Sequence, residues 1–350
     1  MNKKVLVAVS GGVDSSAAVY LLKEAGYDVT GIMLRLYDKT DENGKILTAD
    51  RDSAKAVCDS LGVDFVYADY RNEFKNDVID TFVNEYISGK TPNPCVQCNR
   101  TVKFRYVFDY AHKNGFDFIA TGHYAQVKVN PQTGESELFK ALDTKKDQSY
   151  VLYNLTSNQL KKLILPLGAY SKPQVREFAK KAGLINYDKA DSQDICFIKG
   201  DYFDFISNYC RKDFPEGDFI DKDGNVLGRH KGIIRYTVGQ RKGLGLSFDS
   251  PRYVIRKDIS DNTVTLGKHE ELFSSVVFAT DVNIISENQS FPFEGTAMIR
   301  YNQTPQPAMI YRLDNGDLKA EFTSPQRAPS PGQSLVIYHG DKVIGGGIIR

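Results

Sequence analysis

The 350-residue sequence has no apolar run that approaches the roughly 20 residues of a membrane-spanning helix. The apolar stretch near its start, KVLVAV, is short and meets a Gly-Gly turn, which indicates a strand and not a signal peptide. The formal net charge is only +1, so the molecule as a whole is not a polycation. Five cysteines, an odd number, argue against a disulfide framework. We therefore expect a cytosolic protein that does not engage a membrane.

Strand and helix patterns alternate over the first 120 residues, and no solenoid repeat or low-complexity tract interrupts them. Strands are expected at 4–9, 28–36, 64–69 and 116–123, and helices at 14–26, 53–62, 74–89 and 102–115. This alternation predicts an α/β fold with a doubly wound parallel sheet.

The pattern changes after residue 124. A hairpin is expected over 125–142, followed by helices at 149–165 and 171–183. Short alternating strands and turns then fill the rest of the chain, which predicts a small, mostly-β central domain and a C-terminal β-barrel. The expected domains are 1–205, 206–272 and 273–350.

The stretch AVSGGVDSS stands at a strand-to-helix turn, where two glycines allow the backbone to approach a ligand closely. The free N–H groups at the start of the helix favour an anion such as phosphate. A Walker loop is excluded because Gly-Lys-Ser/Thr is missing, and a dinucleotide fingerprint because a third glycine is missing. Ser10, Asp14, Ser15 and Ser16 add hydroxyls that suit phosphate and a carboxylate that suits Mg²⁺.

The stretch TPNPCVQC holds Cys95 and Cys98 in a stiff loop, and Cys196 is a third candidate thiol farther along the chain. Structural zinc, a redox pair and sulfur transfer are the three interpretations. Zinc needs four ligands, and no second CxxC or His pair lies near Cys196. A thioredoxin-like pair follows a first strand, a place that the phosphate loop occupies here. Sulfur transfer needs one thiol to carry sulfur and a second to resolve a disulfide. We interpret Cys58 and Cys210 as buried apolar residues.

The motif SGGVDSS resembles the PP-loop of ATP pyrophosphatases, which cleave ATP between the α and β phosphates and attach AMP to a substrate oxygen. TPNPCVQCNRTVKF, ATGHYA, KKDQSYVLYNL, DSQDICFI, YTVGQRKGLG and PGQSLVIY follow in the order seen in bacterial tRNA-specific 2-thiouridylases. The resemblance spans nearly the whole chain. It implies a tRNA-uridine 2-sulfurtransferase that adenylates the C2 oxygen of the wobble uridine, U34, and replaces it with sulfur from a cysteine persulfide, with release of AMP and pyrophosphate.

The resemblance also implies roles for individual residues. Cys98 matches the nucleophile, and Cys196 matches the cysteine that carries the persulfide. The residues implied for ATP are Ala8, Val9, Ser10, Gly11, Gly12, Val13, Asp14, Ser15, Met33 and Gly122. Those implied for the target base are Asn93, Pro94 and Cys95. Those implied for tRNA contact are His123, Lys146, Asp147, Gln148, Arg300, Tyr301 and Gln333.

The better-studied members of this family carry Asp, a proposed acid/base residue, where this chain has Cys95. The substitution opens an alternative mechanism, in which Cys95, Cys98 and Cys196 hold a 4Fe–4S cluster with one iron free for sulfide. In the persulfide mechanism, a disulfide forms between Cys98 and Cys196 instead. Another PP-loop tRNA-modifying ligase is a further alternative. The implied partners are ATP with Mg²⁺, tRNAs of the Lys, Glu and Gln type, and a cysteine desulfurase or sulfur-relay protein.

Residues 224–248 contain five Lys/Arg and no acidic residue. A solvated hairpin face would explain the charge alone. With the resemblance, tRNA binding becomes the better interpretation, because Arg235 and Arg241 suit phosphate contact and Tyr236 suits base stacking.

Overall fold

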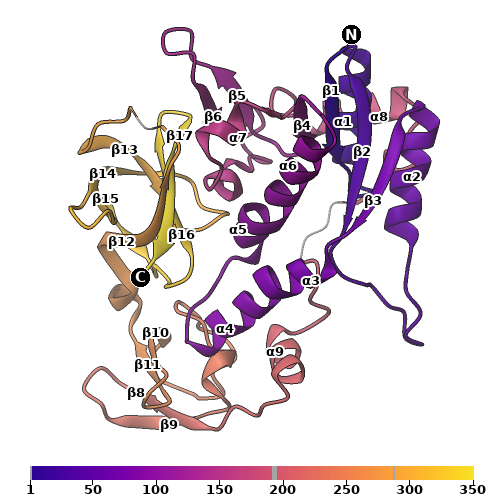
Figure 1. The fold of residues 1–350 in the computed structure, drawn as a ribbon. Helices are drawn as coiled ribbons and strands as arrows, with labels where there is room; N and C mark the ends of the chain where they lie inside the picture. Colours follow the sequence, from indigo (N-terminus) through magenta and orange to yellow (C-terminus); the bar gives the residue numbers. More distant parts are fainter. Residues whose placement is uncertain (1, 191–194, 287) are drawn as a thin grey trace.

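The computed structural model describes residues 2–190, 195–286 and 288–350. Figure 1 shows an N-terminal α/β region, a C-terminal barrel beside it, and a smaller β-rich region below both. In the part of the chain that is described, no helix is long and apolar enough to cross a membrane.

A five-stranded parallel sheet with the order β3-β2-β1-β4-β7 forms the N-terminal region. Its strands are β1 (Lys4–Ala8), β2 (Asp28–Arg35), β3 (Asp64–Asp69), β4 (Phe118–Thr121) and β7 (Leu163–Ile164). Val5 and Val7 of β1 join the core on one face, and Leu6 joins the core on the other, because side chains alternate along a strand. Burial on both faces explains the apolar run that β1 makes in the sequence.

Helices cover both faces, which confirms the doubly wound sheet. Two helices, α1 (Val13–Glu24) and α2 (Ala49–Leu61), contribute to the core on the Val5 face, and α6 (Phe104–Lys113) to the core on the Leu6 face. The remaining helices of this region are α3 (Arg71–Phe74), α4 (Thr81–Ile87), α5 (Pro94–Cys98), α7 (Ser157–Leu160) and α8 (Lys172–Lys181). Wide π-helical turns join α3 to α4 (Lys75–Asp80) and α5 to α6 (Asn99–Lys103).

Six strands close the C-terminal barrel, because β12 pairs with β15 on one side and with β17 on the other. They are β12 (Phe273–Ile284), β13 (Phe293–Met298), β14 (Gln306–Arg312), β15 (Leu318–Arg327), β16 (Ser334–His339) and β17 (Lys342–Ile349). The expected hairpin consists of β5 (Gln126–Val129) and β6 (Ser136–Phe139), and β6 pairs with β17. The α/β region is therefore joined to the barrel by a shared sheet.

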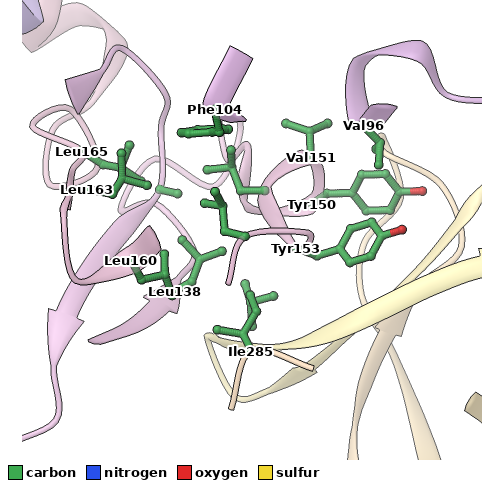
Figure 2. Close-up of a cluster of buried hydrophobic side chains, with 14 of the residues drawn as sticks. Val96, Phe104, Leu138, Tyr150, Val151, Tyr153, Leu160, Leu163, Leu165 and Ile285 are labelled. Carbon is green, nitrogen blue, oxygen red and sulfur yellow. The ribbon is translucent and has the colours of Figure 1, made fainter. Parts of the chain in front are cut away.

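The segment 149–165 is not the single helix that its pattern predicts. A 3₁₀ turn at Ser149–Leu152 and α7 are separated by a capping box at Thr156, and β7 follows. The Tyr150 hydroxyl donates a hydrogen bond to the Ser334 carbonyl at 2.8 Å, and the Ser334 hydroxyl donates to the Tyr153 oxygen at 3.3 Å. Burial of both tyrosines in the core shared with the barrel (Figure 2) outweighs the local helix propensity.

The central β-rich region has its own core. Its strands are β8 (Gly217–Ile220), β9 (Val226–His230), β10 (Tyr253–Asp258) and β11 (Thr263–Gly267), in the order β10-β11-β8-β9, and α9 (Tyr202–Cys210) packs with them. Tyr236 is only 4% exposed in this core, so the expectation that it stacks on RNA bases is wrong. Arg235 and Arg241 stay exposed, as expected.

Candidate active site

The phosphate loop lies where the strand order of the parallel sheet reverses. β2 and β3 extend the sheet on one side of β1, and β4 extends it on the other. Open α/β sheets bind ligands in the crevice that such a reversal leaves at the carboxyl ends of the strands. The loop follows Ala8 at this end of β1, and Gly122 directly follows β4.

Hydroxyl groups hold the phosphate loop in shape through short-range contacts. The Ser15 hydroxyl accepts from the Ser10 amide at 3.1 Å and donates to the Gly12 carbonyl at 3.1 Å. The Ser16 hydroxyl also donates to that carbonyl, at 3.0 Å. The helix α1 begins at Val13, directly after this turn. Its unpaired amides and positive end therefore face the loop.

Two positions of the loop region must be glycine, because backbone atoms of other segments lie very close to them. A Cβ atom on Gly11 would lie 2.4 Å from the carbonyl oxygen of Asp50, and Gly11 has a φ of +74°. A Cβ atom on Gly122 would lie 2.8 Å from the Ser15 amide nitrogen. Both positions thus bring other segments tightly against the loop, where a side chain would have no room.

Asp14 forms a partly buried ion pair that the sequence did not indicate. Both of its carboxylate oxygens lie 2.7 Å from the Lys172 ammonium, and one accepts from the Tyr124 hydroxyl at 2.7 Å. Lys172 is the first residue of α8 and is 8% exposed. A carboxylate engaged in this way is not a free ligand for Mg²⁺. Within the described residues, no group of three or more acidic, His or Cys side chains could hold a metal ion.

The segment after α8 also contacts the phosphate loop. The sequence analysis did not predict these contacts. The buried Asn186 amide donates to the Gly11 carbonyl at 3.1 Å and to the Ser16 hydroxyl at 2.9 Å. Lys189 donates to the Gly11 carbonyl at 3.1 Å and pairs with Asp50 at 2.8 Å. No local motif marks these residues, because they reach the loop only through the tertiary fold.

The cysteine pair lies in a helix that starts before it, at Pro94. The Asn93 side chain caps this helix by accepting from the Cys95 amide at 3.1 Å and from the Val96 amide at 3.3 Å. Cys95, in the first turn, is exposed, whereas Cys98, at the end of α5, is 5% exposed. The pair is therefore not in the expected loop, and Cys98 does not stand at a helix N-terminus, whereas α6 confirms the helix expected at 102–115.

An aromatic cluster brings Cys98 and Cys196 to one place, although they are far apart in the sequence. Cys98 packs with Phe74, and Tyr37 and Phe197 lie against the same cluster. The ring of Phe74 contacts those of Tyr37 and Phe197 at 5.9 and 5.7 Å between centroids. Cys196 precedes Phe197 and is hydrogen-bonded to the Tyr37 side chain. The four residues before Ile195, 191–194, lie outside the described residues.

Burial keeps the Cys98 thiol in its neutral form. Desolvation raises the pKa of the Cys98 thiol to about 12, and the nearby Lys103 ammonium opposes this rise. Desolvation also raises the pKa of Cys196, and Lys103 again opposes the rise. All five cysteines are free. Reactive thiolates must therefore form at the moment of reaction, because the thiolate and not the thiol is the nucleophile.

Tyr301, one of the residues expected at the tRNA surface, lies close to Cys95. The Tyr301 ring contacts Tyr150 at 5.8 Å between centroids, and its hydroxyl is hydrogen-bonded to Gln148. The charge of an ionised Cys95 would act on Tyr301, so these groups are near one another. Gln333 donates to the Thr91 carbonyl at 2.6 Å, directly before the Asn93 segment.

Other residues expected to contact tRNA have structural partners. The Asp147 carboxylate accepts from the Ala141 and Ser149 amides and from the Ser149 hydroxyl. The Arg300 guanidinium donates to the Ala328 carbonyl at 2.6 Å. Lys146 is half-buried.

His123 is not suited to bind phosphate as a cation. Desolvation and then the charge of Lys103 lower the pKa of His123 to about 3. One ring nitrogen lies 2.8 Å from the Thr121 hydroxyl, and the ring stacks on Phe104 at 5.8 Å. His123 is therefore a neutral residue at neutral pH.

A cavity of about 240 Å³ opens on the barrel side of α5. Its lining includes Asn93 and Pro94, expected to meet the target base, together with Glu85 of α4 and the paired side chains of Arg100 and Asp281. The cavity lies between the α/β region and the barrel, so both regions shape the surroundings of the cysteine segment.

Comparison with known proteins assigns each region of the fold to a class. Residues 3–200 match the tRNA methyl transferase HUP domain, 203–268 the tRNA methyl transferase PRC-barrel domain, and 274–349 the aminomethyltransferase beta-barrel domain. The chain is thus a HUP-domain protein with two appended β domains, as the structure shows.

Curated relatives narrow this class. The chain is 46% identical to the tRNA-specific 2-thiouridylase MnmA of Clostridioides difficile (strain 630), over 100% of this chain and 99% of the relative. It is 44% identical to that of Acetivibrio thermocellus, also over 100% and 99%. The chain belongs to the tRNA-specific 2-thiouridylase family. A solved U34-tRNA thiolase, NcsA from Methanococcus maripaludis, is 20% identical over 59% of this chain and 64% of that chain, with a TM-score of 0.37, and adds nothing to this assignment.

Proposed function

We propose that this protein is an ATP-dependent tRNA-uridine 2-sulfurtransferase that acts on the wobble uridine, U34. The observation that carries the proposal is the meeting of Cys98 and Cys196 at one aromatic cluster. The same parallel sheet carries the phosphate loop at the carboxyl end of β1. One site activates an oxygen with ATP, and the other holds two thiols that can exchange sulfur.

The first half-reaction belongs to the phosphate loop. The C2 oxygen of uridine attacks the α phosphorus of ATP, the bond between the α and β phosphates breaks, and pyrophosphate leaves. The start of α1 binds phosphate oxygens through its free amides. Lys172 and Lys189 lie at the loop and supply positive charge beside the phosphate oxygens. The Asp14 carboxylate is already engaged by Lys172, so it is not a free ligand for Mg²⁺.

The second half-reaction belongs to the thiols. The terminal sulfur of a persulfide on Cys196 attacks C2, the C2–oxygen bond breaks, and AMP leaves. The Cys98 thiolate then attacks the Cys196 sulfur, and the electron pair of the broken sulfur–sulfur bond leaves with the 2-thiouridine. Each attacking sulfur gives up its proton to solvent. A disulfide between Cys98 and Cys196 remains, and a dithiol reductant with a new persulfide donor resets the enzyme.

The described residues do not fit the iron–sulfur alternative. Cys95 and Cys196 are exposed and Cys98 is buried, and no group of three potential ligands among the described residues could hold a metal. We therefore favour the persulfide mechanism, in which Cys95 supports the target base without binding iron. An exposed cysteine beside Tyr301 suits this position, because the base must enter from solvent.

The protein partners follow from this chemistry. The substrate is tRNA of the Lys, Glu and Gln type, and its contacts are expected around Tyr301, Gln148 and Gln333 and on the exposed Arg241. The sulfur donor is a protein persulfide, from a cysteine desulfurase or a relay protein. We also propose the division into a catalytic domain, 1–205, and two tRNA-contacting domains, 206–272 and 273–350. Separate apolar cores of the central region and the barrel support it.

The test is reconstitution with ATP, a tRNA transcript and a persulfide donor, followed by mass spectrometry of nucleosides and measurement of AMP. We expect 2-thiouridine at position 34 and one AMP for each sulfur transferred. Absence of 2-thiouridine despite tRNA binding contradicts the proposal. The Cys95→Ser variant separates the mechanisms: it slows a persulfide enzyme, whereas it removes iron and all activity from a cluster enzyme. Iron and labile sulfide are measured on anaerobically purified protein.

A further inference from the structure

Lys103 occupies an unusual place beside the two thiols. It ends the π-helical turn Asn99–Lys103, which starts directly after Cys98. A π-helical turn bonds residue i to residue i+5 and is frequently found at functional sites. Here the turn places the Lys103 amide against the Cys98 sulfur, to which it donates a hydrogen bond. Lys103 is half-buried between the buried residues Val102 and Phe104.

Among the described residues, the Lys103 ammonium has no acidic partner, and its side chain makes no hydrogen bond. Its electrostatic neighbours are instead the thiols of Cys95, Cys98 and Cys196. A half-buried ammonium that faces thiols is well placed to pair with a thiolate, since a desolvated charge needs an opposite charge.

We propose that Lys103 is the positioning cation of the thiol site, which holds the thiolates of Cys98 and Cys196 beside each other during sulfur transfer. The proposal rests on the function proposed above, because it assigns a role within the second half-reaction.

The other groups around the thiols cannot replace Lys103. Tyr37 is hydrogen-bonded to Cys196 but is neutral, because desolvation raises its pKa. His123 is also neutral, because desolvation lowers its pKa to about 3. Cys95 can add only negative charge. In the described part of the chain, Lys103 is the cation that acts on both working thiols.

The test compares the pH dependence of thiol alkylation in Lys103→Gln and Lys103→Arg. Iodoacetamide is added to the full-length protein without ATP or tRNA, and modification of Cys196 and Cys98 is followed by mass spectrometry. We expect the alkylation midpoint of Cys196 to rise by about one pH unit in Lys103→Gln, so that the rate at neutral pH falls about tenfold. Lys103→Arg keeps the charge and the parental midpoint. Lys113→Gln, at the exposed end of α6, is the matched control and should change nothing.

A second measurement separates this role from a structural one. Thiolation by Lys103→Gln should fall at least tenfold, whereas tRNA binding and AMP formation in single-turnover adenylation stay near the parental level. Where a thermal melt shows that Lys103→Gln does not fold, Lys103→Met, which keeps the aliphatic stem, takes its place. Parental alkylation midpoints in a folded neutral variant overturn the proposal. If the parent protein does not thiolate tRNA, the proposed function fails, but the alkylation result still reports on Lys103.

Discussion

The phosphate loop and the thiol site are held in opposite ways. The turn of the loop is fixed by hydroxyl contacts within a few residues of each other, such as Ser10 with Ser15 at 3.1 Å, and Asn186 and Lys189 support it from outside. The thiol site is assembled from distant segments through the apolar contacts of Tyr37, Phe74 and Phe197. The loop is therefore polar and preformed for an anionic ligand, whereas the buried Cys98 thiol stays neutral until it reacts. The two half-reactions should be separable by mutation.

The largest effect is expected from Cys98→Ser and Cys196→Ser. Each should lower thiolation at least about 10³-fold, because a residue that acts in a covalent unit is not replaced by its neighbours. AMP formation in a single turnover should persist, since the phosphate loop is untouched. Cys210→Ser, on a partly exposed cysteine of α9, is the control. Parental thiolation by either variant would remove the thiol site from the mechanism.

The next largest effect is expected at the phosphate loop, from a substitution of Asp14. Asp14→Asn should lower AMP formation about 10²-fold, because the carboxylate positions the Lys172 ammonium at the loop, and loss of a hydrogen bond to a charged group costs about 2–3 kcal/mol. Unfolding by denaturant should show a loss of about 2 kcal/mol, since Lys172 loses its ion pair with Asp14. The double variant Asp14→Asn/Lys172→Met should lose less stability than the sum of the single variants. Strict additivity would show that the ion pair does not stabilise the loop. Alkylation of Cys196 should be unchanged throughout.

The same contrast explains what the sequence could predict. The phosphate loop, the doubly wound sheet and the hairpin of β5 and β6 depend on local patterns, and the structure confirms the sheet and the hairpin. The thiol site depends on tertiary contacts, so residue spacing alone left zinc, redox and sulfur-transfer chemistry open. The family resemblance, and not the spacing, gave Cys196 its role as the persulfide carrier.

The predictions that the structure contradicts failed because of tertiary contacts. The helix expected at 149–165 is interrupted because Tyr150 and Tyr153 are buried in the core shared with the barrel. Tyr236 is buried in the core of the central region and is not available to RNA bases. Asn186 and Lys189 were missed because they reach the phosphate loop from beyond α8. In each case a contact between distant segments outweighed the local pattern.

A moderate effect concerns His123, which lies beside the thiol site. Its pKa, about 3 in the folded protein, is below the ordinary value, so the unfolded chain binds a proton first as pH falls. Stability should therefore be lost as pH falls below about 6.5, by about 2 kcal/mol at pH 5. His123→Phe should remove this part of the acid sensitivity, whereas the exposed His112→Phe should not. The measurement is urea unfolding at pH 7 and pH 5. Equal pH sensitivity in the parent and His123→Phe contradicts the assignment.

The smallest effect tests the tRNA surface outside both catalytic sites. Arg241 is exposed on the central region, and a phosphate contact there would release counterions on binding. Arg241→Ala should therefore weaken tRNA binding only a few-fold at moderate salt, and reduce the slope of log affinity against log salt by about 0.9. The matched control is Arg256→Ala, because Arg256 is exposed on β10 and pairs with Asp258 at 2.8 Å. Filter binding across a salt series measures both variants. If Arg241→Ala keeps the parental slope, this arginine does not contact RNA phosphate, and the basic stretch 224–248 is a solvated face after all.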